Sequence, residues 1–132
     1  MKKRMVFTLA ALLLLAAVAF PVAEARAAMM NLLGSSNMTP TGKSVQFGGN
    51  SISSITEDTI TVTSTLWEKR DGTWHAVSSV TKTKENASQV SASKTYTVAG
   101  GHYYRVTSVH TSQTGAVSHT VTTSTASTWI PA

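Results

Sequence analysis

Apolar and hydroxyl side chains alternate from Thr59 to Leu66, so that every second residue is a threonine. The other face of this segment carries Ile60, Val62, Ser64 and Leu66. A period of two sends successive side chains to opposite sides of a strand, whereas a helix would mix both kinds on every face. The segment therefore predicts a half-buried β-strand with a threonine-lined outer face.

Turn-forming residues separate this strand from several others like it. Asp71-Gly72 is typical of a tight hairpin, and further breaks fall at Glu85–Ser88, Ala99–Gly101 and Thr114–Gly115. Short strands between such turns, in about 100 residues, are typical of two antiparallel sheets that cover each other's apolar faces. We therefore predict an all-β fold, an antiparallel β-sandwich of the immunoglobulin-like class with about six to seven strands.

The strand expected after Asp71-Gly72 has an irregular parity. Within Thr73–Thr81, Trp74 and Val80 fall on one parity and Val77 on the other. One inserted residue reverses the facing of every residue that follows it. We therefore expect a β-bulge in this segment.

The first 27 residues have the three regions of a secretory signal peptide. Lys2-Lys3-Arg4 forms a positive start, an apolar run from Met5 to Phe20 follows, and small residues flank Arg26. The apolar run is shorter than the roughly 20 residues that cross a bilayer as a helix. We therefore expect a helical signal peptide over residues 1–27, its cleavage, and a secreted, extracellular protein that is not held in a membrane.

Residues 28–42 lack a sustained period and end in turn-forming residues, which predicts a linker or flexible N-terminal arm. The alternative is that Leu32 and Leu33 add an edge strand to the sheet. Residues 43–132 contain all the other expected strands and are predicted to form the β-sandwich domain.

Composition excludes several kinds of chemistry. The chain has no cysteine, which rules out disulfide staples, a thiol nucleophile and cysteine-ligated zinc. Residues 28–132 contain seven Lys or Arg and five Asp or Glu, and seven minus five leaves a net charge of +2. No basic stripe with interleaved aromatic residues remains after cleavage, so we expect no nucleic-acid partner.

Two tyrosines follow the turn at Gly100-Gly101. Tyr103 and Tyr104 stand just before alternating small or apolar positions, a pattern that resembles the tyrosine corner of immunoglobulin and fibronectin type III sandwiches. We expect Tyr104 to face inward together with Val106 and Ser108. Its hydroxyl is expected to bond a backbone group a few residues upstream.

Three runs of the sequence are similar to those of an uncharacterised family of small secreted bacterial proteins. These runs are Thr61–Trp74, Thr95–Val98 and Gly101–His110, and the similarity extends over about residues 50–128. The resemblance implies export and a β-fold like that of immunoglobulin or fibronectin type III domains. It implies no catalytic residues.

His110 and His119 flank the expected turn at Thr114–Gly115. A hairpin loop centred on that pair places the two histidines directly across from each other, with Cβ atoms about 5 Å apart. Two imidazoles at that distance can begin a metal site if His75 supplies a third ligand. The alternative is a solvated polar pair.

Trp67, Tyr103 and Trp129 are expected to point outward. Exposed aromatic rings stack on sugars or fill hot spots of protein interfaces, so these three are candidate binding residues. The alternative is that each ring caps an open end of the sandwich.

The sequence carries no recognisable catalytic arrangement. It has no Gly-x-Ser-x-Gly elbow, and the neighbours Ser118 and His119 point to opposite faces of a strand. We therefore expect a secreted, non-enzymatic protein without a cofactor, an extracellular binding or structural module whose partner is an extracellular protein or glycan. The alternative is a metal-binding protein or metal-assisted hydrolase that uses His110 and His119.

Overall fold

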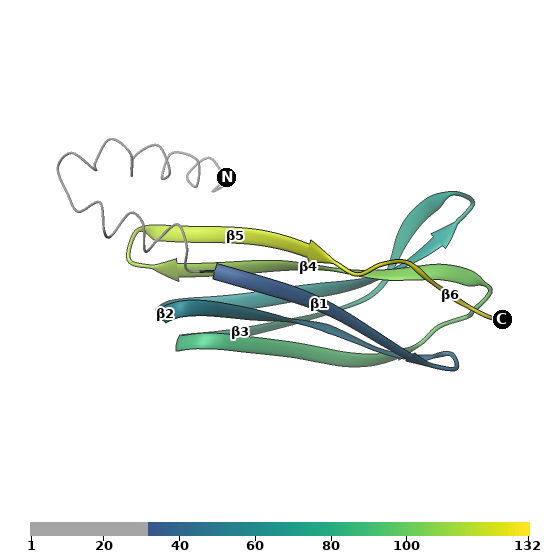
Figure 1. Cartoon of the computed structure of the whole chain (residues 1–132), viewed down its shortest axis with the longest axis horizontal. Coiled ribbons are helices and arrows are strands. Elements are labelled where there is room, and N and C mark those ends of the chain that lie inside the picture. Colours follow the sequence, from purple (N-terminus) through teal and green to yellow (C-terminus); the bar gives the residue numbers. More distant parts are fainter. Residues whose placement is uncertain (1–31) are drawn as a thin grey trace.

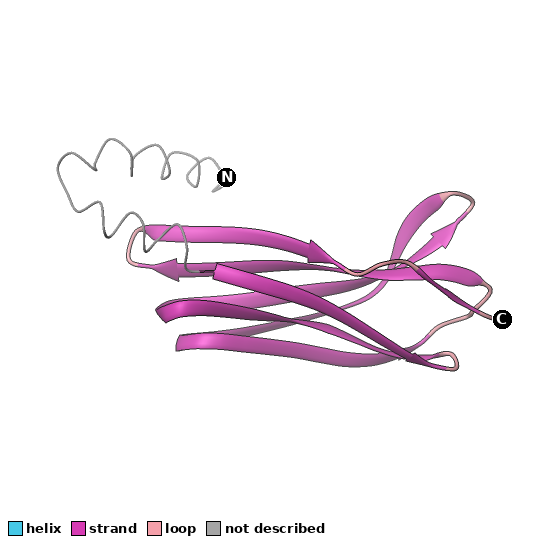
Figure 2. Ribbon diagram, in the orientation of Figure 1, coloured by secondary structure: helices cyan, strands magenta, loops and turns pink. Residues whose placement is uncertain are grey.

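The computed structural model describes residues 32–132, so the predicted signal peptide lies outside the described residues. The described part consists of strands and the turns between them (Figures 1 and 2). The strands are β1 (Leu32–Thr41), β2 (Ser44–Arg70), β3 (Thr73–Thr97), β4 (His102–Thr114), β5 (Val117–Ser124) and β6 (Thr128–Ile130). No helix able to span a membrane occurs in residues 32–132. The prediction of an all-β fold is confirmed.

The strands form one antiparallel sheet in the order β1-β2-β4-β5, in which β3 also pairs with β2 and β6 with β4. The first part of β2 lies between β1 and β3, and its second part between β3 and β4. The β2–β3 hairpin bends back where its pairing shifts between Ile52 and Glu57. As a result, Ser36 of β1 contacts Ser108 of β4 and Thr123 of β5. The sheet is therefore curled into a half-barrel (Figure 1), while its division into two immunoglobulin-like sheets stays a prediction.

β1 occupies most of the segment that was predicted to be a linker, and that prediction is corrected from Leu32 onward. All ten residues of β1 pair with β2, and a tight turn with Gly42 at a φ of 63° joins the two strands. Leu32 is buried and Leu33 is exposed. Backbone pairing holds this segment without an apolar period, so the alternative of an edge strand is the one that the structure contains.

Two apolar clusters occupy the inside of the half-barrel. The first contains Val45, Phe47, Leu66, Val98, Tyr104, Val106 and Ile130, and the second contains Leu32, Ile60, Val62, Val90 and Ala92. The inward face predicted for Ile60 through Leu66 is confirmed, because both ends of that row are fully buried. Each large side chain in these clusters contributes about 1.5–3 kcal/mol through burial.

A β-bulge interrupts β3 at Val77, as predicted. The residues on either side of Val77 pair with the consecutive residues Leu66 and Trp67 of β2, so Val77 has no cross-strand partner. The extra residue reverses the facing of the strand. Trp74 therefore lies on the outer face of the sheet, while Val80 packs against the core.

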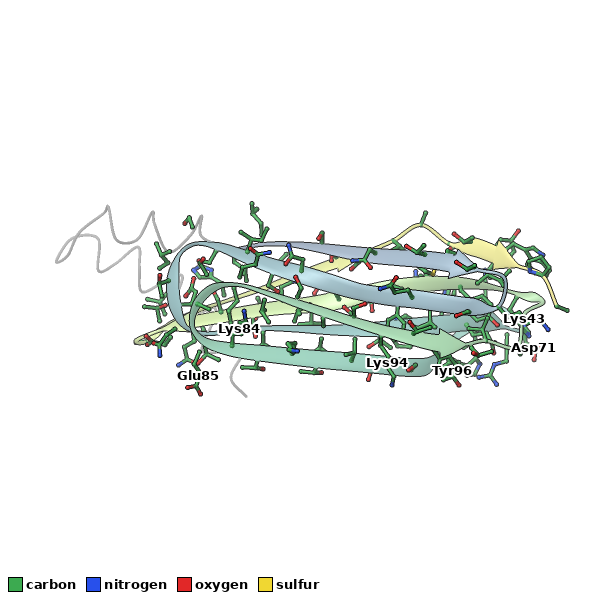
Figure 3. The ribbon with its side chains drawn as sticks, turned by 90° about the horizontal axis from the view of Figure 1, so that it is seen from below. Lys43, Asp71, Lys84, Glu85, Lys94 and Tyr96 are labelled. Carbon is green, nitrogen blue, oxygen red and sulfur yellow. The ribbon has the colours of Figure 1, made fainter. Side chains whose placement is uncertain are left out.

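The β2–β3 hairpin closes in a tight turn at one end of the molecule and bends back on itself at the other end. Asp71 and Gly72 close the hairpin with positive φ angles of 49° and 79°, as a two-residue type I′ turn requires. Lys43 and Asp71 lie at this end, whereas Lys84 and Glu85 lie at the end where the hairpin bends back (Figure 3). We refer to the end with Asp71 as the tip end.

Candidate binding surface

The outer face of the sheet carries aromatic and cationic side chains at the tip end, which we call the aromatic band. Its members are Trp67 and Lys69 of β2, Trp74 of β3, Tyr103 and Arg105 of β4, and Trp129 of β6. The strand register brings them together as the pairs Lys69 with Trp74, Trp67 with Arg105, and Tyr103 with Trp129. Directly opposed residues share a face, so four neighbouring strands build one surface.

Contacts within the aromatic band hold its rings in place. The indole Nε1 of Trp67 donates a hydrogen bond of 2.9 Å to Oγ1 of Thr107. The rings of Tyr103 and Trp129 meet edge to face with their centroids 5.2 Å apart. These two residues are 48% and 51% exposed. Trp67, Tyr103 and Trp129, the three predicted binding residues, therefore share one face, with Tyr103 and Trp129 the more open to solvent.

Two cations lie over the ring of Trp74. The guanidinium carbon of Arg105 is 4.4 Å from a ring centroid of Trp74, and Nζ of Lys69 is 5.8 Å from it. Both distances fall within the roughly 6 Å over which a cation is attracted to an aromatic face. The Nε atom of Arg105 is shielded from solvent and has no hydrogen-bond partner among the described residues. The aromatic band is thus positively charged as well as apolar.

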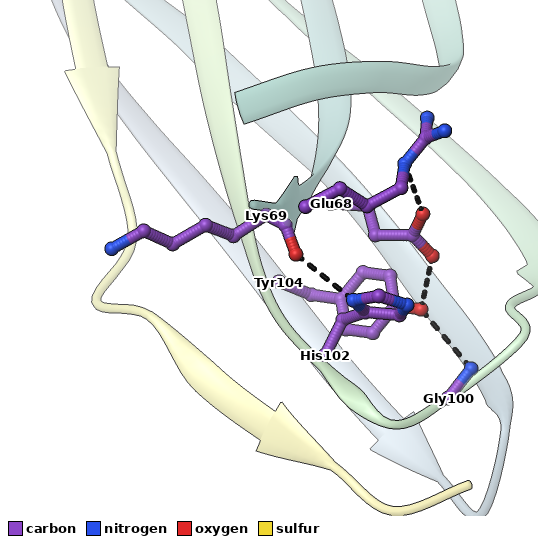
Figure 4. A network of polar contacts seen from close by, with 6 residues as sticks. Glu68, Lys69, Gly100, His102 and Tyr104 are labelled. Carbon is purple, nitrogen blue, oxygen red and sulfur yellow. Dashed lines mark hydrogen bonds and ion pairs between the residues drawn. The ribbon is translucent and has the colours of Figure 1, made fainter. Parts of the chain in front are cut away.

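Glu68 and Tyr104 alternate with members of the aromatic band along β2 and β4, so they face the inner side of the sheet. Figure 4 shows the polar contacts that they make there. The hydroxyl of Tyr104 accepts a hydrogen bond of 3.1 Å from the backbone N–H of Gly100 and donates one of 2.5 Å to Glu68. The same carboxylate lies 2.9 Å from Nε of Arg70. Burial, and then the hydrogen bond to Glu68, raise the pKa of Tyr104 to about 12. The expectation that Tyr104 faces inward and bonds a backbone group a few residues upstream is confirmed, and the raised pKa keeps its phenol protonated.

His110 and His119 both lie on the inner side of the sheet, but they are not opposite each other. The loop between β4 and β5 is Gly115–Ala116, one residue later than predicted. His110 consequently pairs with Val121, and His119 pairs with Ser112. The prediction of a directly facing histidine pair is wrong.

Contacts from β2 determine the position of this turn. The hydroxyl of Thr114 donates a hydrogen bond of 2.5 Å to Glu57, and the N–H of Gly115 donates one of 2.8 Å to Asp58. Gly115 takes a φ of 60°, which glycine adopts without strain. Thr114 therefore remains in β4, paired with Val117. Residues far away in the sequence shift the register by one position.

A series of hydrogen bonds, which we call the hydroxyl chain, passes through His110. Its ring contacts Ser51 Oγ through Nδ1 and Thr123 Oγ1 through Nε2, at 2.8 Å each. From Thr123 the chain continues through Ser36, Ser108 and Ser64, with 2.7 Å between successive hydroxyl oxygens. The hydroxyl chain thus links β1, β2, β4 and β5 across the inside of the half-barrel.

Hydroxyl groups engage both ring nitrogens of His110. Ser51 gives its one hydroxyl proton to the carbonyl of Thr61 at 3.0 Å and lies 2.8 Å from Nδ1 of His110, while Oγ1 of Thr123 lies 2.8 Å from Nε2. Burial lowers the pKa of His110, which favours the neutral ring. Both ring nitrogens are therefore engaged, and neither is free to ligate a metal ion.

His119 differs from His110 because one of its ring nitrogens is unpaired within residues 32–132. Its Nε2 is buried without a hydrogen-bond partner in the described residues. Burial lowers its pKa, although the nearby carboxylate of Glu57 acts in the opposite direction. His75 is exposed on β3, opposite Glu68. Over residues 32–132, no three His, Asp or Glu side chains are close enough together to hold a metal ion.

Sequence reasoning found three of the six residues of the aromatic band and missed Lys69, Trp74 and Arg105. The pairing of Lys69 with Trp74 could have been predicted from the sequence, because a two-residue turn at Asp71-Gly72 places these two residues opposite each other. Arg105 enters the band only through the pairing of β2 with β4. That register depends on tertiary contacts and leaves no local signal in the sequence.

Comparisons with known proteins concern the fold. No protein-family model matches the chain, and no curated protein matches it either. The solution structure of CsgH from R. palustris is similar over 70% of this chain and 89% of that one, with a TM-score of 0.45 and 8% identity. The crystal structure of the sporulation control protein Spo0M from Bacillus subtilis matches 77% of this chain and 50% of its own length, with a TM-score of 0.42 and 12% identity. The function therefore has to be inferred from this chain's own side chains.

Proposed function

We propose that this protein is an exported, non-enzymatic binding module that recognises a polysaccharide through the aromatic band. One observation carries the proposal: four neighbouring strands present their rings on one face, with Tyr103 and Trp129 about half exposed. Sugar rings have apolar faces that pack on aromatic rings. Because the rings project from paired strands, little of their freedom remains to be lost on binding.

The remainder of the outer face favours a glycan over a protein partner. Threonine hydroxyls cover it, and two cross-strand pairs bond to each other, Thr61 with Thr83 at 3.0 Å and Thr63 with Thr81 at 3.1 Å. The core of a protein interface is usually enriched in apolar and aromatic area. Outside the aromatic band this face offers mainly hydroxyl groups and isolated aliphatic side chains such as Val109.

The proposed place of action is outside the cell. It rests on the predicted signal peptide of residues 1–27 and on the similarity to small secreted proteins. We further propose that the half-barrel is an immunoglobulin-like sandwich, in which β1 and the first part of β2 face β4 and β5. In that arrangement the aromatic band lies on the outer side of one layer, where a long polymer can reach it.

Expression of the full chain in a secreting bacterial host tests the proposed export and supplies protein for the binding test. We expect the protein to be recovered from the medium with its first residues removed near position 27, as determined by N-terminal sequencing. Retention of the whole chain in the cells would contradict export.

Retention on insoluble polysaccharides then tests recognition, with the secreted protein applied to a panel of neutral and acidic polymers. We expect Trp129→Ala to weaken retention about tenfold or more, as loss of an aromatic hot spot does. Val109→Ala is the matched control, because Val109 is 42% exposed on the outer face of the neighbouring β4 but lies outside the band. Equal retention of both variants and the unaltered protein would contradict the proposed function.

A further inference from the structure

We infer that the polysaccharide is acidic, and that Arg105 and Lys69 bind carboxylate groups on its sugars; this inference rests on the proposed function. The aromatic band combines two chemistries on one surface. A neutral glycan needs only the rings and polar side chains around them. The two cations over Trp74 therefore call for an explanation of their own.

No ion pair joins Lys69 or Arg105 to a carboxylate of the residues that the structure describes. Glu68, next to Lys69 in sequence, points to the inner face and is engaged by Tyr104 and by Arg70. Asp71 lies in the exposed hairpin turn, and Glu85 lies at the opposite end of the molecule (Figure 3). Within residues 32–132, both band cations are therefore left without a carboxylate partner.

Arg105 also has an unused hydrogen-bond donor. Its Nε is out of contact with water and has no acceptor in the described residues, which is uncommon for a buried polar atom. Because Nε is shielded in this way, a carboxylate from solution reaches Arg105 through its two terminal nitrogens. They form an edge of two parallel N–H groups, the arrangement through which arginine binds a carboxylate best.

The stacking of Arg105 on Trp74 prepares it for this role. A guanidinium that already packs on a ring has lost much of its side-chain freedom before a ligand arrives. Lys69 reaches the same ring from β2, so that one anionic group near Trp74 can meet both charges. A uronic acid fits this surface, because its ring offers an apolar face and its edge carries a carboxylate.

The test compares two forms of one polymer, polygalacturonate and its methyl ester, so that only the carboxylate charge differs. We expect the protein to bind the ester about tenfold more weakly than the acid in affinity electrophoresis. Raising the salt concentration should weaken binding of the acid and leave binding of the ester nearly unchanged. Equal binding of the two forms overturns the inference, as does retention on neutral polysaccharides alone.

Charge-neutralising variants assign the effect to the two cations. We expect Arg105→Gln and Lys69→Gln each to weaken binding of polygalacturonate about fivefold to tenfold and to leave the binding of its ester unchanged. Lys94→Gln is the matched control, because Lys94 is an exposed cation of β3 outside the aromatic band. An equal loss in the control overturns the inference, since it indicates attraction to net charge.

The outcomes separate this inference from the proposed function. If Trp129→Ala abolishes binding of the acid and the ester alike while the Arg105 and Lys69 variants behave as unaltered protein, the acidic ligand is excluded and the binding module stands. If Trp129→Ala changes no binding to any polymer, the proposed function itself fails. Far-UV circular dichroism of each variant verifies that the sheet is intact.

Discussion

Two regions on the inside of the half-barrel use the same strand alternation and are held together differently. The first apolar cluster, around Phe47 and Leu66, is fully buried and needs only volume and shape. The hydroxyl chain begins at Ser64, two residues before Leu66 on the same face of β2, and depends on each of its partners being present. Neighbouring positions on one face of a strand can therefore be stabilised in two ways: by burial of apolar area, as at Leu66, or by polar groups that are all hydrogen-bonded, as at Ser64.

The hydroxyl chain also requires backbone space that the apolar cluster does not. A Cβ atom on Gly49 would lie 2.7 Å from the hydroxyl of Ser108 and 2.8 Å from that of Ser64, and one on Gly34 would overlap the ring of His110. Real side chains do not approach so closely. These two glycines make room for short polar bridges between the facing parts of the sheet.

The largest expected effect comes from removing a side chain of the first apolar cluster. Phe47→Ala leaves a cavity where the ring was fully buried, and we expect it to lower the free energy of unfolding by about 3–5 kcal/mol. Urea unfolding at neutral pH measures it. Leu33→Ala serves as control, because Leu33 is 69% exposed, and should change stability by less than about 0.5 kcal/mol. A loss below that of the control would show that this cluster does not hold the fold.

A smaller loss is expected when the hydroxyl chain is cut. Ser108→Ala removes the shared partner of Ser36 and Ser64 and should cost about 1–3 kcal/mol, because buried hydroxyls are left unpaired. The double variant Ser64→Ala with Ser108→Ala should cost less than the sum of the two single changes, since both members of one pair are gone. Additive losses in urea unfolding would contradict a coupled chain.

The smallest effect is expected from pH. Burial lowers the pKa of His110 and of His119 below the usual value of 6.5, so the unfolded chain takes up protons that the folded chain does not. Stability should be constant above about pH 6.5 and fall below it, by at most about 1.4 kcal/mol per pH unit for each proton.

Unfolding measured from pH 8 to pH 5 in His110→Asn should show a shallower decline than in the unaltered protein. His75→Gln, a change at an exposed histidine, should keep the full decline. The same decline in all three proteins would argue that other groups cause the pH dependence.

The features of the fold that could be predicted from the sequence are those that depend on a few consecutive residues. The alternation at Thr59–Leu66, the turn at Asp71-Gly72, the bulge near Val77 and the corner at Tyr104 were all predicted. Each depends on side-chain parity or on the conformational preferences of a few consecutive residues. These features could be inferred without knowing which strands pair.

Features that depend on distant contacts could not be predicted. β1 has no apolar period, and pairing with β2 makes it a strand. The one-residue error at Gly115 follows from its hydrogen bond to Asp58, which no local pattern indicates. In the candidate site, Trp67, Tyr103 and Trp129 were recognisable as aromatic residues, whereas Arg105 became a member only through the β2–β4 register.

The position of β3 has a consequence for solubility. Over its 25 residues β3 pairs with β2 and with no other described strand, so one backbone edge faces outward along the molecule. Such an edge can template fibril growth by other chains. Lys82, Lys84 and Lys94 are exposed along β3, and Lys84 and Lys94 are visible in Figure 3. We expect their mutual repulsion to keep molecules dispersed, so that acetylation of these amines would favour fibrils.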